Sequence, residues 1–181
     1  MRGRRPLTDE EIESVVFEGA YASRDKALFV LGIKTGLRVS ELLSLRVKDL
    51  TDRVQVARRN TKGKVSSRSV VYHPDARAAV DAWITEAHLG AEDPVFKSRR
   101  GSGPIGRIQA WKILKAAFEA AMISGPTGTH SLRKTFAKKI YAALDKDLVK
   151  TQAALGHRDV NSTAQYLSFE TEEVDSAVLS I

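Results

Sequence analysis

The hydrophobic pattern of this chain follows a helical period almost throughout and changes only once, between residues 53 and 72. There, two short β-branched runs, 53–57 and 69–72, flank a polar, basic stretch from Arg59 to Arg68 that contains Gly63. Two such runs around a glycine-containing loop predict a β-hairpin. One hairpin inside helical sequence predicts a mainly α fold with a small antiparallel β-sheet, an α+β chain of ordinary domain size.

The helical segments have recognisable start and stop residues. Thr8, with Glu11 three residues later, forms a capping-box pattern, so the first helix is expected to begin there. Ser23 is expected to cap a second helix that ends at Gly36, and a third covers residues 39–45. Pro74 is expected to open a helix that runs to residue 89. The remaining helical patterns cover residues 108–123, 131–144, 148–155 and 162–168, and a short tail helix is expected at 172–180.

Composition excludes several classes of protein. Hydrophobic residues make up 43% of the 181, which is typical of a globular domain with a sizeable core. No apolar run approaches the length of a membrane span, and no signal-peptide pattern follows the N-terminal residues. The chain has no cysteine, which excludes disulfides, thiolate metal sites and cysteine nucleophiles. We therefore expect a cytoplasmic protein without membrane contact.

The charge is positive and unevenly distributed. Lysine and arginine total 29 against 22 acids, a formal net charge of +7. Residues 97–139 hold ten of these cations and one acid, Glu119, whereas residues 170–181 hold four acids and no base. A basic surface with a separate acidic tail favours a polyanionic partner. The alternative, equally compatible with charge alone, is a merely solvated basic surface.

Three local patterns carry chemistry. Arg38 follows the helix-ending Gly36, where a guanidinium and free backbone N–H groups form a good phosphate seat, and Glu41 lies on the same helix face. His130 and Arg133 share one face of a predicted helix start, an arrangement that again suits an anion. The third pattern is Leu155-Gly-His157 with Tyr166 nine residues later. Taken singly, each pattern has an ordinary structural explanation. The first could be a surface ion pair, the second a chance occurrence of His-x-x-Arg, and the third a core histidine with a core tyrosine.

The order of these patterns is more specific than any one of them. An arginine, a basic hairpin loop, His-x-x-Arg, a histidine and a tyrosine follow one another along the chain. The chain resembles the tyrosine recombinase or phage integrase family from about Leu7 to Leu167. The matching residues are Thr35-Gly-Leu-Arg-Val-Ser-Glu-Leu-Leu-Ser-Leu45, His130-Ser-Leu-Arg133, Thr135-Phe-Ala137, Leu155-Gly-His157 and Tyr166. The resemblance implies the catalytic-domain fold of that family.

The resemblance also implies a role for each matching residue. Arg38 and Arg133 are similar to the two catalytic arginines, and Glu41 to the carboxylate that supports the first. His130 and His157 are similar to the two catalytic histidines, and Tyr166 to the nucleophile. Lys62 is similar to the lysine of the hairpin, although Lys64 is close enough to compete for that role. The family often has histidine after the second arginine, where this chain has Lys134.

These residue types suit phosphodiester cleavage on chemical grounds. Two guanidinium groups neutralise the charge that builds on the non-bridging oxygens, and cationic neighbours favour the phenolate of a tyrosine. A flexible lysine can protonate the departing 5′ oxygen. The sequence has no acidic cluster suited to Mg²⁺ and no HExxH or Walker pattern, so we expect a reaction without metal or other cofactor.

The resemblance leaves the context of the domain open. We expect one catalytic domain over residues 1–181, with a basic arm at 1–7, a tail helix at 170–181 and no core-binding domain before it. Such a chain is either a fragment of a longer integrase or similar to the short fimbrial phase-variation recombinases. The expected partner is double-stranded DNA, with a homo-tetramer on synapsed DNA and a monomer in free solution. The alternatives are a type IB topoisomerase and an inactive DNA-binding module.

Overall fold

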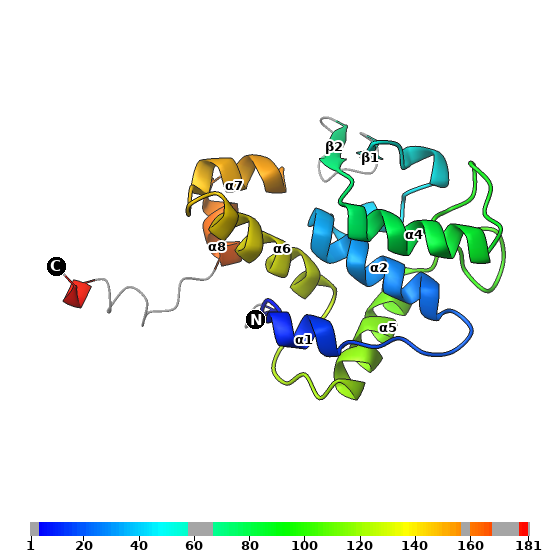
Figure 1. Cartoon of the computed structure of the whole chain (residues 1–181), viewed down its shortest axis with the longest axis horizontal. Helices are drawn as coiled ribbons and strands as arrows, with labels where there is room; N and C mark the ends of the chain where they lie inside the picture. Colours follow the sequence, from blue (N-terminus) through cyan, green and yellow to red (C-terminus); the bar gives the residue numbers. More distant parts are fainter. Residues whose placement is uncertain (1–3, 58–66, 157–159, 168–177, 181) are drawn as a thin grey trace. The chain divides into compact units, whose positions relative to one another are not determined.

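The computed structural model describes residues 4–57, 67–156, 160–167 and 178–180, and its chain divides into two compact units, Met1–Phe136 and Ala137–Ile181. Each unit is described by itself (Figure 1). The elements are α1 (Asp9–Ser14), α2 (Ala22–Thr35), α3 (Val39–Leu42), the short 3₁₀ helix η1 (Val47–Asp49), β1 (Arg53–Val56), β2 (Arg68–Val71), α4 (Pro74–Glu86), α5 (Arg107–Ala120), α6 (Thr129–Ala143), α7 (Leu148–Leu155) and α8 (Val160–Leu167). The prediction of a mainly α fold with one small antiparallel sheet is confirmed.

The sheet consists of β1 and β2 alone within the described residues. They pair antiparallel, with Arg53 opposite Val71 and Val56 opposite Arg68. Val54 and Val56 of β1 are buried, as expected for a strand with one face on the core. In β2 the same alternation places Arg68 on the partly buried face. The predicted hairpin is confirmed, and residues 58–66 of its loop lie outside the described residues.

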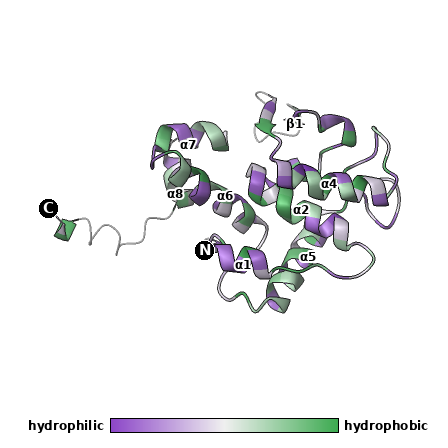
Figure 2. Cartoon of the chain, viewed as in Figure 1, coloured by the Kyte–Doolittle hydropathy of each residue, from purple (hydrophilic) through white to green (hydrophobic). Residues whose placement is uncertain are grey.

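The core of the first unit forms where α2 packs along α4. Ala27, Leu28 and Leu31 of α2 are fully buried, as are Ala76 and Val80 of α4. Figure 2 shows that these helices carry hydrophobic residues along one side and hydrophilic residues along the other. Each fully buried leucine contributes about 1.5–3 kcal/mol by removal from water. Burial of this stripe therefore fixes α2, which leads directly into the candidate site.

Two loop residues complete this core. Val95 and Phe96 are fully buried, and the Val95 carbonyl accepts a hydrogen bond of 2.7 Å from the indole N–H of Trp83. The basic loop that starts at Lys97 is thus anchored at its beginning in the core. A second cluster joins Phe29 and Ile33 of α2 to α5, α6 and the N-terminal segment through Leu114, Phe118, Leu132 and Leu7.

Several predicted helix ends are confirmed. Thr8 forms the capping box with Glu11, and Gly36 ends α2 in the left-handed conformation. Ser23 was the wrong cap: Tyr21 occupies the N-cap position of α2, and the Ser23 hydroxyl hydrogen-bonds the Glu86 carboxylate of α4 instead. A tertiary partner has overridden the local preference.

Other predicted boundaries differ by a few residues. The predicted third helix, 39–45, ends at Leu42, although Leu43 and Leu45 are buried as expected. The helix that begins at Pro74 ends at Glu86 and not at residue 89. The helices expected at 108–123 and 131–144 span Arg107–Ala120 and Thr129–Ala143. Terminal turns are set by tertiary contacts and vary most.

The second unit contains the end of α6 with α7 and α8. The Asp147 carboxylate caps α7 by accepting 2.9 Å hydrogen bonds from the N–H groups of Val149 and Lys150. Gly156 ends this helix with φ of 62°, and α8 packs against it. The bounds predicted for α7 are confirmed, whereas α8 begins at Val160 and not at residue 162. The described residues include only 178–180 of the expected tail helix.

No helix in the described part of the chain has both the length and the apolar composition that crossing a membrane requires.

Candidate active site

The candidate active site is built on the turn that joins α2 to α3. Gly36 has φ of 60°, which glycine adopts without strain, and its N–H bonds the Gly32 carbonyl at 3.0 Å. A Cβ atom at Gly36 would lie 2.2 Å from the ring of Phe136, so α6 approaches this turn too closely for any side chain. The turn directs the chain so that Arg38 becomes the N-cap residue of α3.

Glu41 holds Arg38 in place from the first turn of α3. Its Oε1 accepts a hydrogen bond of 3.0 Å from Nη1 of Arg38, and its Oε2 accepts one of 2.8 Å from the Arg38 backbone N–H. The Glu41 side chain is 1% exposed, whereas that of Arg38 is 23% exposed. A buried, doubly bonded carboxylate therefore orients a guanidinium that still reaches solvent. This is not the exposed surface pair that the sequence alone allowed.

A second arginine shares this carboxylate. Nη1 of Arg68, the first residue of β2, lies 3.8 Å from Oε2 of Glu41, and its side chain is 13% exposed. The sequence analysis placed Arg68 only at the edge of the hairpin loop and gave it no role. The signal that could have found it is register, because alternation along β2 puts Arg68 on the same inward face as Val70.

Arg133 connects α6 to the same turn. Its side chain is fully buried, and Nη1 donates a hydrogen bond to the Gly36 carbonyl oxygen. His130 lies one helical turn earlier, in the first turn of α6, and is exposed. The structure therefore brings together four of the predicted site residues in the first unit: Arg38, Glu41, His130 and Arg133.

The cations of this cluster act on His130. Loss of water around the imidazole and the positive charges of Arg133, Arg38, Arg4 and Lys134 lower the pKa of His130 below its usual value of 6.5. A histidine with a lowered pKa is neutral near pH 7, so it can both accept and donate a proton.

The N-terminal arm contributes Arg4 to this surrounding charge. The Arg5 N–H donates to the Pro126 carbonyl at 2.9 Å, and the Arg5 guanidinium bonds both the Ser124 carbonyl and Glu11. Nε of Arg4 lies 3.4 Å from where a Cβ atom at Gly128 would be. The predicted basic arm thus lies along the loop that leads to His130, a placement that the sequence did not indicate.

The other predicted site residues belong to less completely described segments. Lys62, its competitor Lys64, and His157 lie outside the described residues. Tyr166 lies within α8, and its side chain lies outside the described part of the chain. The roles that the resemblance implies for these residues stay predictions.

Tyr72 is a poor candidate for the nucleophile. It is 5% exposed, and its hydroxyl has no hydrogen-bond partner among the described residues. Burial raises the pKa of the phenol well above its usual value, and nearby Asp81 adds to this effect. The guanidinium of Arg77 lies 4.5 Å from the ring centre and covers it. A covered phenol that resists ionisation cannot attack a phosphodiester.

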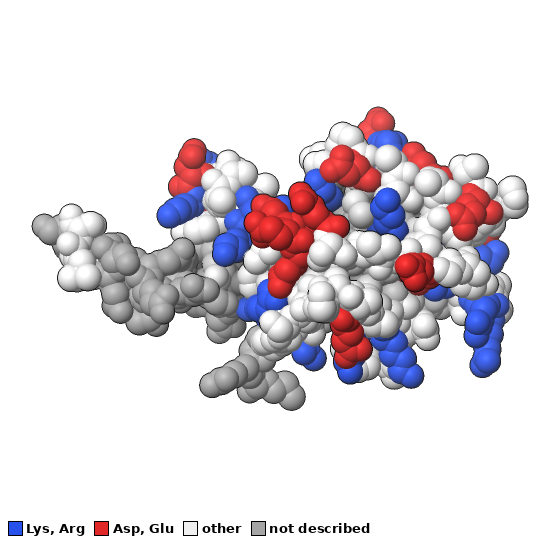
Figure 3. Space-filling model, turned by 60° about the horizontal axis from the view of Figure 1, so that its bottom comes forward, with Lys and Arg blue, Asp and Glu red and all other residues white. Residues whose placement is uncertain are grey.

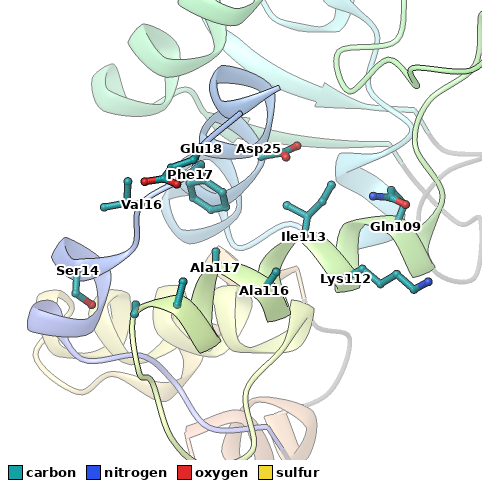
Figure 4. Close-up of a pocket in the computed structure, with 12 residues that line it drawn as sticks. Ser14, Val16, Phe17, Glu18, Asp25, Gln109, Lys112, Ile113, Ala116 and Ala117 are labelled. Atoms are coloured by element: carbon teal, nitrogen blue, oxygen red, sulfur yellow. The ribbon is translucent and has the colours of Figure 1, made fainter. Parts of the chain in front are cut away.

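The structure also contains a groove with a different lining. About 570 Å³ of space lies between the segment after α1 and one face of α5, lined by Val16, Phe17, Ile113 and several alanines (Figure 4). None of the predicted catalytic residues lines it. A site for a DNA backbone is expected to be an open, cationic surface, so we place the chemistry at the arginine cluster and not in this groove.

Acidic and basic side chains are interspersed on the face shown in Figure 3, apart from one compact group of acidic side chains. Helix α1 alone carries three acids in its first turn, Asp9, Glu10 and Glu11. Among the described residues, no group of three or more histidines and acids is placed to hold a metal ion.

Comparison with known proteins gives consistent results. The model of the phage integrase family matches residues 5–173. The chain is 36% identical over 177 residues to the type 1 fimbriae regulatory protein FimE of Escherichia coli K12, covering 92% of this chain and 86% of FimE. It is 31% identical over 154 residues to the probable integrase/recombinase YoeC of Bacillus subtilis 168, covering 85% of this chain and 82% of YoeC.

Solved structures show the same fold. The XerH site-specific recombinase bound to its palindromic difH substrate, in a post-cleavage complex, superposes with a TM-score of 0.78 at 25% identity. The match covers 96% of this chain and 52% of XerH, so the chain spans about half the length of that protein. The XerA recombinase superposes with a TM-score of 0.79 at 21% identity, over 99% of this chain and 64% of XerA.

Proposed function

Because this chain belongs to the phage integrase family, we propose that it cleaves and rejoins double-stranded DNA through a 3′-phosphotyrosine intermediate. Its family and its relatives are tyrosine-type site-specific recombinases, and this chain is one of them. Neither the family nor the relatives favour a topoisomerase or an inactive DNA-binding module. The observation that carries the mechanism is the cluster at the α2–α3 turn, where Glu41 orients Arg38 and Arg133 bonds the Gly36 carbonyl.

The arginines prepare the phosphate for attack. A phosphodiester repels nucleophiles by its own charge, and the guanidinium groups of Arg38 and Arg133 would neutralise its non-bridging oxygens as charge builds there. Both groups are held by the folded chain, so little reorganisation is needed when the reaction starts. His130, neutral near pH 7 because its pKa is lowered, would donate a hydrogen bond to the same oxygens.

The remaining residues would exchange the bonds. The Tyr166 hydroxyl gives its proton to solvent, and its oxygen bonds the phosphorus. The bond from phosphorus to the 5′ oxygen breaks, and Lys62 gives that oxygen a proton. His157 would contact the phosphate together with His130. Rejoining reverses each step, with a 5′ hydroxyl displacing Tyr166. No metal or other cofactor takes part in these steps.

Partners and assembly follow from the same proposal. XerH, which shares this fold, has been solved bound to its difH substrate, and this supports DNA as the partner of this chain. We expect a homo-tetramer on synapsed DNA, a monomer in free solution and a cytoplasmic location at the nucleoid. The segment 170–181 would contact a neighbouring subunit in the synaptic complex.

A nicked suicide duplex, cut from the DNA that flanks the gene, tests the mechanism. Cleavage releases a short strand and traps the protein covalently, so the wild type should give an adduct that denaturing gels separate. Tyr166→Phe should abolish the adduct while retarding the same duplex on a native gel, because only the nucleophilic oxygen is lost. An adduct in this variant would make Tyr141 the nucleophile, and no adduct with the wild type would refute the proposed function.

A second substrate separates the leaving-group step. Lys62→Ala should slow cleavage of the ordinary duplex and recover on a duplex with a 5′-thiolate leaving group, which needs no proton. Lys64→Ala is the matched control, and recovery of that variant alone would identify Lys64 as the acid.

Two further assays test the metal-free mechanism and the topoisomerase alternative. EDTA should leave the wild-type cleavage rate unchanged. A supercoiled plasmid without the site should not be relaxed, whereas rapid relaxation would indicate a topoisomerase.

A further inference from the structure

We propose that Arg68 is a positioning residue for the phosphate-binding Arg38, and that it acts through the carboxylate that they share, Glu41. The proposal rests on the function proposed above and adds to it a residue with no assigned role. Three features carry it: the shared contact, the burial of the Glu41 and Arg68 side chains, and the balance of charge among the three residues.

The contact places Glu41 between two arginines. Its Oε1 bonds Arg38 at 3.0 Å, and its Oε2 faces Arg68 at 3.8 Å, a distance for attraction between charges rather than a hydrogen bond. The side chains of Glu41 and Arg68 are 1% and 13% exposed, so solvent screens their interaction little. Burial lowers the pKa of Arg68, the Glu41 charge opposes that shift, and the Arg38 charge adds to it.

The balance of charges gives Arg68 a function. With both arginines present, the three side chains carry a net charge of +1, and Arg38 is the most exposed of them. Without Arg68, the net charge falls to zero, and Glu41 is compensated by Arg38 alone. The uncompensated Glu41 carboxylate then draws the Arg38 guanidinium more strongly toward itself and away from a bound phosphate. Arg68 therefore lets one carboxylate orient Arg38 without cancelling its charge.

The position of Arg68 in the chain suggests a rival role. It is the first residue of β2 and follows directly the hairpin loop that carries Lys62. Its contact with Glu41 could anchor that loop and so affect protonation of the leaving group. The two roles concern different steps of the reaction, so different substrates separate them.

The test is cleavage of three versions of the suicide duplex by Arg68→Gln. On the ordinary phosphodiester we expect the rate to fall about tenfold, less than the roughly hundredfold or greater loss on removing a direct donor to the reacting oxygen. On a duplex with a neutral methylphosphonate at the scissile position, the loss should largely disappear, because less charge needs to be neutralised. On the 5′-thiolate duplex the loss should persist.

Changes to the partner give an independent test. In a Glu41→Gln background, Arg68→Gln should have little further effect, because the charge that Arg68 balances is gone. Arg68→Lys should keep most of the activity, since it keeps the charge. Arg53→Gln is the matched control: Arg53 lies in β1, is exposed and hydrogen-bonds Ser69, so its loss should not distinguish the substrates.

Three outcomes would overturn the proposal. Equal losses on phosphate and methylphosphonate would leave Arg68 a purely structural role, and recovery on the 5′-thiolate would assign it to the hairpin lysine. If Arg68→Gln does not fold, as judged by thermal melting, Arg68→Lys is measured in its place. A loss of about tenfold in Arg68→Lys, which keeps the charge, would overturn the proposal. Absence of any adduct with the wild type would refute the proposed function instead.

Discussion

Two turns of this molecule share one backbone conformation and differ in their surroundings. α2 ends at Gly36 with φ of 60° and ψ of 19°, and α7 ends at Gly156 with φ of 62° and ψ of 39°. Each glycine precedes a predicted catalytic residue. Gly36 lies two positions before Arg38, and Gly156 lies one position before His157. Gly36 is buried against Phe136, whereas Gly156 is exposed. Both turns favour glycine for the dihedral angle, and the first requires it also because Phe136 leaves no space for a side chain.

Gly36→Ala should have the largest effect. Alanine in the left-handed conformation costs about 1–2 kcal/mol, and displacement of the Phe136 ring costs about 1–3 kcal/mol more. We expect a loss of about 2–5 kcal/mol in the free energy of unfolding, together with loss of DNA cleavage because Arg38 and Arg133 both depend on this turn. Urea denaturation followed by circular dichroism measures the first effect.

The second glycine provides the comparison. Gly156→Ala should cost only the dihedral penalty of about 1–2 kcal/mol, because the residue is exposed. In a Phe136→Leu background, the cost of Gly36→Ala should fall toward this value, since a smaller side chain leaves room for the new methyl group. Equal costs for the two single variants in the wild-type background would show that packing against Phe136 does not distinguish the turns.

Arg4→Gln should have the smallest effect of these variants. It removes one positive charge near His130 and so changes the pKa of that residue. Removal of one of the cations that lower the pKa of His130 should raise that pKa toward 6.5. The lowered pKa means that the unfolded chain binds the proton more readily, so stability is lost as pH falls through 6.5 toward the native value. Arg4→Gln should reduce this loss, as measured by NMR titration of His130 and melting at several pH values.

Arg46→Gln is the matched control for this effect. Arg46 is exposed and is not among the charges that act on His130. An equal shift of the His130 pKa in both variants would mean that net charge, and not the nearby position of Arg4, sets the titration.

Local signals in the sequence predicted most of the fold. The capping box at Thr8, the end of α2 at Gly36, the end of α7 at Leu155 and the single hairpin are all decided within a few residues, and all are confirmed. Ser23 shows where this reasoning fails, because its hydroxyl bonds Glu86, 63 residues away. Val95 and Phe96 were likewise missed, since a short apolar pair beside a basic loop gives no sign of burial.

In the candidate site, too, the local contacts were predictable from the sequence and the long-range contacts were not. The sequence order predicted the roles of Arg38 and Glu41, and their spacing of three residues predicted the contact between them. It could not predict Arg68 or Arg4, whose contacts with the site depend on strand register and on the path of the N-terminal arm. The roles of Lys62, His157 and Tyr166 still rest on the family resemblance.

The link between the two ends of the first unit also sets an order in time. Leu7 donates its N–H to the Thr135 hydroxyl at 2.9 Å, and Arg133 bonds the Gly36 carbonyl 97 residues earlier. Almost three-quarters of the chain must therefore have emerged from the ribosome before the contacts of the N-terminal arm and of the arginine cluster can form. A nascent chain shorter than 133 residues holds only one of the two predicted arginines, and the predicted nucleophile Tyr166 is made later still. We therefore expect that the growing polypeptide cannot cut DNA until both its first unit and α8 have been made.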